Sequence, residues 1–117
     1  MRFGRVHHVS LNVTDLAAAT TFYTEVLELP VLPRPDFDFG GLWLDAGEQQ
    51  IHLIEVDEFV APPGQHFALQ VDDLATTVTE LTRRGVDVSP PRTIDDVCAQ
   101  AFLTDPTGNL IELNQPL

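Results

Sequence analysis

The feature that most constrains the fold of this chain is an internal repeat. His8 matches His66 at a distance of 58 residues, and each heads a short segment of alternating polarity. The other matches follow in the same order: Val13-Thr14-Asp15-Leu16 with Val71-Asp72-Asp73-Leu74, Arg34 with Arg92, Leu44-Asp45-Ala46-Gly47 with Leu103-Thr104-Asp105-Pro106-Thr107-Gly108, and His52 with Glu112. An ordered run of matches predicts two copies of one supersecondary unit.

Both halves show the same order of predicted elements, because hydrophobic residues recur with a strand period and then with a helix period. In the first half we predict a strand over 5–13, a helix over 15–28 capped by Thr14 or Asp15, and strands over 36–45 and 49–56. In the second half we predict a strand over 65–72, a helix over 73–84 ended by Gly85, and strands near 86–89, 97–104 and 109–115. Although only two strands are assigned after the first helix, the repeat leads us to interpret each half as a βαβββ module.

The predicted fold class is α+β, with two paired βαβββ modules that form a curved mixed sheet around a cleft and carry their helices on the outer faces. The modules are residues 1–60 and 61–117, divided at the stiff stretch Val60-Ala61-Pro62-Pro63-Gly64. A module of about 55 residues buries too little surface to be stable alone, so we expect one duplicated domain. The pairing can occur within one chain or between two chains.

Charge and composition exclude several function classes. The formal net charge of −12, with no basic stripe, disfavours nucleic acid as a partner. No stretch approaches the roughly 20 apolar residues of a membrane span, and the first residues lack the apolar region of a signal peptide. Cys98 is the only cysteine, which excludes an intramolecular disulfide. We expect a soluble cytoplasmic protein.

Strand alternation places four strong metal ligands on equivalent polar faces. His8 and His66 lie opposite the apolar residues of their strands. Ile51 and Leu53 suit the helix side, which turns His52 to the cleft, and the same argument applies to Glu112. Three imidazoles and one carboxylate suit zinc, nickel, cobalt, manganese or iron(II). The alternative is a set of hydrogen-bonded cleft histidines; His7, on the helix side or the sheet edge, is interpreted as structural.

Other polar and aromatic residues are candidates for substrate binding. Arg34 and Arg92 each follow a helix in a proline-rich stretch and could hold a carboxylate or phosphate. Trp43 and Phe102 could line the cleft or pack the core. The full set of substrate-binding candidates is Ser10, Asn12, Arg34, Trp43, Gln70, Arg92 and Phe102.

Five segments together resemble one known family. They are HHVSLNVTDL, FYTEVLEL (22–29), GEQQIHLIE (47–55), HFALQVDDL (66–74) and FLTDPTGNLIEL (102–113). Over nearly the whole chain this combination is similar to the vicinal oxygen chelate superfamily, which includes glyoxalase I, methylmalonyl-CoA epimerase, fosfomycin-resistance thiol transferases, extradiol dioxygenases and bleomycin-binding proteins. The resemblance implies one divalent metal ion held by His8, His52, His66 and Glu112. The family often has glutamate or glutamine at the position of His52.

The resemblance implies a metal-dependent, glyoxalase-like lyase or isomerase. Its small substrate would be chelated through neighbouring oxygens and would react through a metal-stabilised enolate, with Glu112 as the catalytic base. Asn12 stands where glyoxalase I typically has an arginine for glutathione. The alternatives are an iron(II) extradiol dioxygenase that uses His8, His66 and Glu112, a thiol transferase acting on an epoxide, and a non-catalytic drug-binding protein. A homodimer is the expected assembly.

Overall fold

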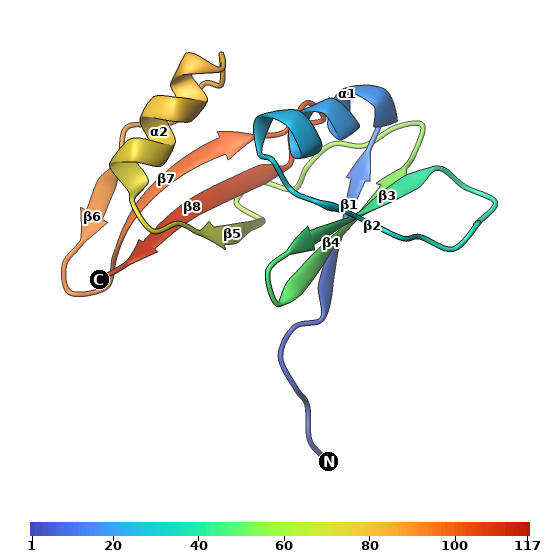
Figure 1. Ribbon diagram of the computed structural model, residues 1–117, viewed down its shortest axis with the longest axis horizontal. Helices are drawn as coiled ribbons and strands as arrows, with labels where there is room; N and C mark the ends of the chain where they lie inside the picture. The colour runs from blue at the N-terminus through green and yellow to red at the C-terminus, as the bar shows by residue number, and fades with distance from the viewer. The chain divides into compact units, whose positions relative to one another are not determined.

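A computed structural model describes all residues of the chain, Met1–Leu117, which divide into two compact units. The first unit is Met1–Val60 and the second is Ala61–Leu117. Each unit contains one four-stranded sheet and one helical segment, as Figure 1 shows. No helix is long and apolar enough to cross a membrane.

The first unit has the order strand, helix, three strands. Its elements are β1 (His8–Val13), α1 (Leu16–Thr21), the π-helical segment η1 (Phe22–Val26), β2 (Val31–Leu32), β3 (Gly41–Ala46) and β4 (Gln49–Glu55). The strands lie in the order β1-β4-β3-β2. β1 runs parallel to β4, and the other neighbours are antiparallel. The unit is therefore a βαβββ module with a mixed sheet.

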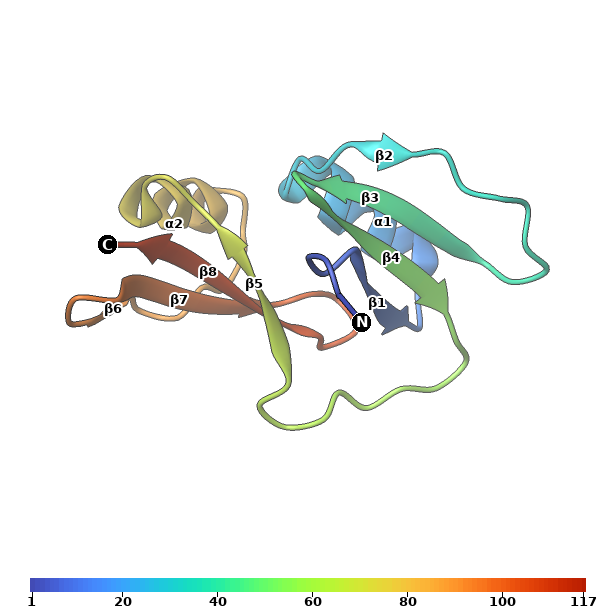
Figure 2. The same ribbon diagram turned by 90° about the horizontal axis from the view of Figure 1, so that it is seen from below.

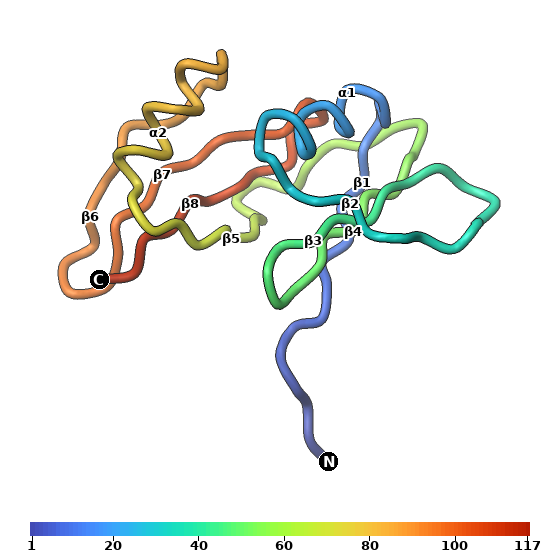
Figure 3. Tube along the Cα trace, viewed as in Figure 1, coloured from blue at the N-terminus to red at the C-terminus, as the bar shows by residue number.

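The second unit repeats this topology. Its elements are β5 (His66–Gln70), α2 (Leu74–Arg83), β6 (Arg92–Ile94), β7 (Cys98–Thr104) and β8 (Leu110–Pro116). The strand order is β5-β8-β7-β6, with β5 parallel to β8. Along the tube in Figure 3, each unit can be followed through a strand, a helix and three further strands. The predicted α+β class and the βαβββ order of both halves are confirmed.

Both helices begin at an aspartate that the repeat had aligned. The Asp15 carboxylate accepts a hydrogen bond from the Ala18 N–H at 3.0 Å, and the Asp73 carboxylate accepts one from the Thr76 N–H at 3.1 Å. Each bond satisfies an N–H that has no partner within the helix. Asp15, rather than Thr14, is thus the N-cap of the first helix.

The first helix is not regular over the predicted range 15–28. The α-helical part ends at Thr21, and a wider π-helical turn follows, in which the Leu27 N–H donates to the Phe22 carbonyl at 2.9 Å. The hydroxyls of Thr20 and Thr24 donate to the carbonyls four residues before them, at 2.7 and 2.6 Å. Such threonine bonds compete with the helical N–H donors and bend a helix.

Two predicted strands were misplaced, and prolines explain the second case. The predicted strand 36–45 begins only at Gly41; residues 36–40 form a loop, and the short edge strand β2 precedes them. Residues 86–89 form no strand, and the edge strand of the second unit is β6 instead. Ser89 still pairs with Phe102, through its N–H at 2.8 Å, but Pro90 and Pro91 have no N–H to continue the ladder.

Each helix covers one face of its own sheet, as Figures 1 and 2 show for α1 and α2. The core of the first unit consists of Val13, Ala19, Phe22, Tyr23, Leu44, Ile51 and Leu53. The core of the second consists of Leu74, Leu81, Cys98, Ala101, Leu103, Ile111 and Leu113. Because alternate strand residues face the helix, the opposite sheet face is left for polar side chains.

Candidate functional site

The parallel strand pair β1–β4 brings His8 and His52 together on the polar face of the first sheet. Ser10 lies directly opposite His52 in the register, so His8 is the diagonal neighbour of His52. The two imidazoles are stacked, with ring centroids 4.1 Å apart and planes 15° from parallel. His8 is exposed, whereas His52 is only 7% exposed.

The surroundings of His52 favour its neutral ring. Its Nε2 lies 2.8 Å from Gln50 Oε1, and because that oxygen only accepts, the contact requires a proton on Nε2. Burial lowers the pKa of His52 below its ordinary value, and the nearby His8, His7 and Arg34 lower this pKa further. A neutral imidazole is the form that binds a metal ion.

The strand pair β5–β8 places His66 and Glu112 in the equivalent diagonal relation. Ala68 lies opposite Glu112 in the register, as Ser10 lies opposite His52 in the first unit. His66 Nε2 is 3.2 Å from Glu112 Oε1. The imidazole is more open to solvent than the carboxylate, since the His66 side chain is 34% exposed and that of Glu112 is 9% exposed.

Neighbouring groups fix the orientation of both members of this pair. The Nδ1–H of His66 donates to the Gly64 carbonyl at 2.9 Å, which directs Nε2 toward the carboxylate. The amide of Asn114 donates to Glu112 Oε2 at 2.6 Å. A backbone carbonyl or an amide that holds the far atom of a ligand is the usual support of metal-binding histidines and carboxylates.

A buried turn determines where β8 begins and therefore where Glu112 lies. Asp105 Oδ1 accepts hydrogen bonds from the N–H groups of Thr107, Gly108 and Asn109 at 3.0, 2.9 and 2.8 Å. Asp105 Oδ2 accepts a fourth bond from the Asn109 side-chain amide at 2.9 Å. Gly108, with φ of +104°, allows the chain to reverse into β8.

The donor atoms of His66 and Glu112 are spaced as two ligands of one divalent ion would be. Two ligand atoms at about 2.1 Å from one ion, at an octahedral or tetrahedral angle, lie about 3.0–3.4 Å apart. The 3.2 Å between His66 Nε2 and Glu112 Oε1 falls in that range. Neither unit alone contains a group of three or more His, Cys, Asp or Glu side chains that could hold a metal ion. Each unit thus presents two of the four predicted ligands.

The structure separates the predicted substrate-binding residues into those near the ligand pairs and those away from them. Trp43 stacks on His52 at 4.1 Å, and Phe102 meets the His66 ring edge-on at 5.4 Å. Ser10, Asn12 and Gln70 share the strand faces of His8 and His66. Arg34 lies in the loop after β2, near enough to lower the pKa of His52. Arg92 lies within the exposed edge strand β6, so Arg34 and Arg92 are not structurally equivalent.

Four residues of these surroundings were missed in the sequence. Gln50 and Asn114 lie two residues from His52 and Glu112 and therefore share their strand faces, a relation that strand alternation predicts. Phe37 and Phe39 lie in the range that was interpreted as strand, where a loop position was not expected. A run of alternating acidic and aromatic residues, Asp36-Phe37-Asp38-Phe39, was the available signal.

The fold is that of a duplicated α+β protein, and each βαβββ unit carries one histidine-containing pair on its first and last strands. Comparison with known families agrees. The model of the Glyoxalase/Bleomycin resistance protein/Dioxygenase superfamily matches residues 5–113. The chain belongs to this superfamily, the vicinal oxygen chelate superfamily.

Three relatives illustrate the range of this superfamily. Probable lactoylglutathione lyase, chloroplastic, of Arabidopsis thaliana is 30% identical over 122 residues, and the match covers 93% of this chain and only 35% of that protein. TnmS3, an antibiotic binding protein from Streptomyces sp. CB03234, is 32% identical with a TM-score of 0.80, covering 100% and 99% of the two chains. A glyoxalase family protein from Enterococcus faecalis is 30% identical with a TM-score of 0.82, covering 97% and 99%.

Proposed function

We propose that this protein is a divalent-metal-dependent, glyoxalase-like lyase or isomerase that acts on a small substrate chelated through two neighbouring oxygens. One observation carries the proposal: both units join a histidine at the head of the first strand to a ligand on the last strand. The pairs are His8 with His52 and His66 with Glu112. The two pairs occupy the same register positions in both modules, which supports a common role for the four residues.

In this proposal the two units form one duplicated domain, and the two pairs hold a single ion, within one chain or across a homodimer. The ion is one of zinc, nickel, cobalt, manganese and iron(II), which suit imidazole with one carboxylate. When bound, it polarises the substrate carbonyl and stabilises negative charge that develops on the neighbouring oxygen. Small polar substrates of this kind also fit a cytoplasmic location.

Glu112 is the proposed catalytic base. The Glu112 residue is 7% exposed, and Asn114 and His66 lie 2.6 and 3.2 Å from its two carboxylate oxygens. A carboxylate that is fixed and shielded from water can remove a proton from the carbon beside a carbonyl more effectively than a mobile one. Asn12, in place of an arginine, argues against glutathione as the cosubstrate.

Metal binding tests the ligand set directly. Elemental analysis of the purified protein should find about one divalent ion per four-ligand site, and calorimetry should measure its affinity. We expect His8→Gln and His66→Gln each to lower the affinity at least about 100-fold, because each removes a direct ligand. The control is His7→Gln, which removes the one histidine outside the set, although His7 touches His8 at 2.9 Å. Equal losses in all three variants would refute the ligand assignment.

Proton exchange tests the reaction. With methylglyoxal and a thiol, the metal-loaded protein should form product and should exchange the proton beside the carbonyl with deuterated water. Glu112→Gln should abolish both, while Glu55→Gln, a change of an exposed glutamate at the end of β4, should alter neither. Product formation that survives Glu112→Gln would eliminate Glu112 as the base.

A second function, non-catalytic binding of a small molecule, is favoured by the likeness to the antibiotic binding protein TnmS3. It predicts a protein that gains no stability from nickel, zinc or manganese and that binds its ligand equally well with a chelator present. A dioxygenase is distinguished by bound iron and by oxygen uptake on catechols. His52, as the proposed fourth ligand, argues against a dioxygenase, because it would occupy a position that oxygen chemistry needs.

A further inference from the structure

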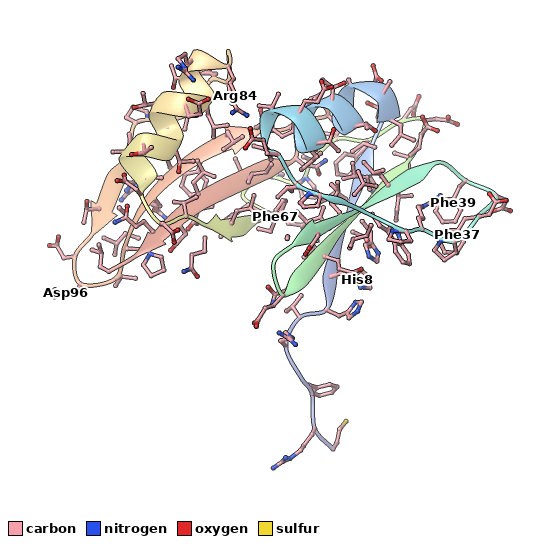
Figure 4. The ribbon with its side chains drawn as sticks, viewed as in Figure 1. His8, Phe37, Phe39, Phe67, Arg84 and Asp96 are labelled. Carbon is pink, nitrogen blue, oxygen red and sulfur yellow. The ribbon has the colours of Figure 1, made fainter.

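Four residues of the first unit form a connected group beside the His8–His52 pair, which we call the aromatic shelf. It consists of Arg34, Phe37, Phe39 and Trp43. The two phenylalanines lie in the loop between β2 and β3, and Figure 4 shows them projecting at its far end. Both remain largely open to water, with exposed fractions of 41% and 44%.

The rings of the shelf are in mutual contact. Phe37 and Phe39 stack with centroids 5.1 Å apart and planes 12° from parallel. Phe37 is also 6.2 Å from Trp43, which in turn stacks on His52 at 4.1 Å. The row of rings therefore runs without a break from the exposed loop to a proposed metal ligand. Aromatic faces arranged in this way present a surface on which a further flat ring can stack.

Arg34 adds a positive charge that no acid neutralises. Its guanidinium carbon lies 4.9 Å from the Phe37 centroid and 5.1 Å from that of Phe39. One terminal nitrogen donates to the Phe39 carbonyl at 2.9 Å, while the buried Nε has no hydrogen-bond partner. Arg34 makes no ion pair, although the chain has 18 acidic residues and two of them, Asp36 and Asp38, lie in the same loop.

The arginine is held in place by the backbone beneath it. A Cβ added at Gly41 would lie 2.9 Å from the Arg34 terminal nitrogen, so the absence of a side chain there makes room for the guanidinium. A fixed arginine loses less conformational freedom when it binds a planar acid group than a mobile one does. Loop packing alone would explain buried rings. It does not explain two stacked, exposed rings beside a fixed and unpaired cation.

We propose that the aromatic shelf binds a planar aromatic ring that carries a carboxylate. The ring stacks on the phenylalanines or on Trp43, and the carboxylate accepts hydrogen bonds from Arg34. This inference deepens the proposed function and rests on it in one respect, because it names the class of substrate that would reach the metal ligands. The stacking site itself needs no metal.

The probe is 2-naphthoate, added to the full chain in the presence of a metal chelator. Calorimetry should detect binding, and the indole N–H resonance of Trp43, the only tryptophan, should shift during the titration. Neutral 2-naphthalenemethanol and non-aromatic cyclohexanecarboxylate should each bind at least about tenfold more weakly, because each lacks one of the two recognised features. If cationic 2-naphthylmethylamine bound more tightly than 2-naphthoate, the proposal that Arg34 recognises a negatively charged group would be refuted.

Matched variants locate the site. Arg34→Gln should weaken naphthoate about tenfold, while Arg92→Gln, on the exposed edge strand of the other unit, should leave it unchanged. The double change Phe37→Leu and Phe39→Leu should weaken binding about three- to tenfold and leave the protein folded, with only a small fall in the urea midpoint, since both rings are partly exposed. Naphthoate binding that is absent, or is insensitive to these changes, refutes the aromatic shelf. Metal affinities in the ligand variants test the metal proposal independently.

Discussion

The turn between β7 and β8 offers the sharpest test of how the second unit positions its ligand pair. Asp105 is 4% exposed, and its carboxylate accepts three backbone N–H bonds and one side-chain amide bond. The substitution Asp105→Ala removes all four acceptor contacts at once. It leaves the strands themselves unchanged, so its effect isolates the turn.

The size of the destabilisation by Asp105→Ala depends on which N–H donors can bind water in place of the carboxylate. Thr107 and Gly108 are partly exposed, so water replaces the carboxylate at modest cost, and the Gly108 N–H keeps its bond to the Asp105 carbonyl at 3.0 Å. Asn109 is 7% exposed, so its backbone N–H and its side-chain amide lose a buried, charged acceptor. At about 1.5 kcal/mol for each of these two donors, the free energy of unfolding should fall by about 3 kcal/mol.

Urea denaturation followed by circular dichroism measures this change. Asp105→Asn should lower the free energy of unfolding less, by about 1–2 kcal/mol, because it keeps one acceptor oxygen. The remaining loss arises because its new NH2 group faces the Asn109 amide. In the folded variant, the loosened turn should also weaken the contact between His66 and Glu112, which a change in the imidazole resonances of His66 would report. A loss below about 1 kcal/mol for Asp105→Ala would refute the reasoning, since the carboxylate would then not be organising the turn.

Three further outcomes follow from single residues. Gly41→Ala should lower the unfolding free energy by about 2 kcal/mol or more in a urea titration, because the new Cβ would lie 2.4 Å from the Leu53 carbonyl oxygen and would force β3 and β4 apart. Gly85→Ala should cost only about 1 kcal/mol in the same assay, because that site has open space and only its φ of +87° is unfavourable. The pKa of His52 is lowered in the folded protein, so this residue binds protons more readily in the unfolded chain. The free energy of unfolding should therefore fall as the pH drops below the ordinary pKa of 6.5. The metal-free His52→Gln variant should lose less stability over the same pH range.

Strand alternation and the repeat predicted most of the fold from sequence. The period of two in the first strand of each half assigned the helix-facing residues, such as Val13, because burial on one side demands it. The N-cap at Asp73 and the stop at Gly85 follow from local chemistry alone. Local rules do not locate the edge strands, since β2 and β6 have two and three residues and are placed by pairing with distant partners.

The sequence also predicted only part of the candidate site. Alternation predicted the faces of the four ligand candidates, whereas the contacts that hold them depend on side-chain reach across strands. Trp43 was a candidate for lining or for packing, and only the register that sets it opposite His52 explains its stacking. The position of Phe37 could not be predicted, because it depends on the loop that follows Pro33 and Pro35.

The duplication explains why the two candidate ligand pairs occupy the same strand positions and have different chemistry. The equivalent registers, Ser10 opposite His52 and Ala68 opposite Glu112, preserve the diagonal relation in both units. The first unit pairs two imidazoles against the flat face of Trp43, and the second pairs an imidazole with a buried carboxylate. A base is needed only once in an isomerisation, so one module can keep the carboxylate while the other adapts its ligand to an aromatic neighbour. Exchanging the residues, with His52→Glu and Glu112→His, would keep the donor set and move the base. Metal affinity should then persist, and the reaction should fail unless the substrate binds in the reverse orientation.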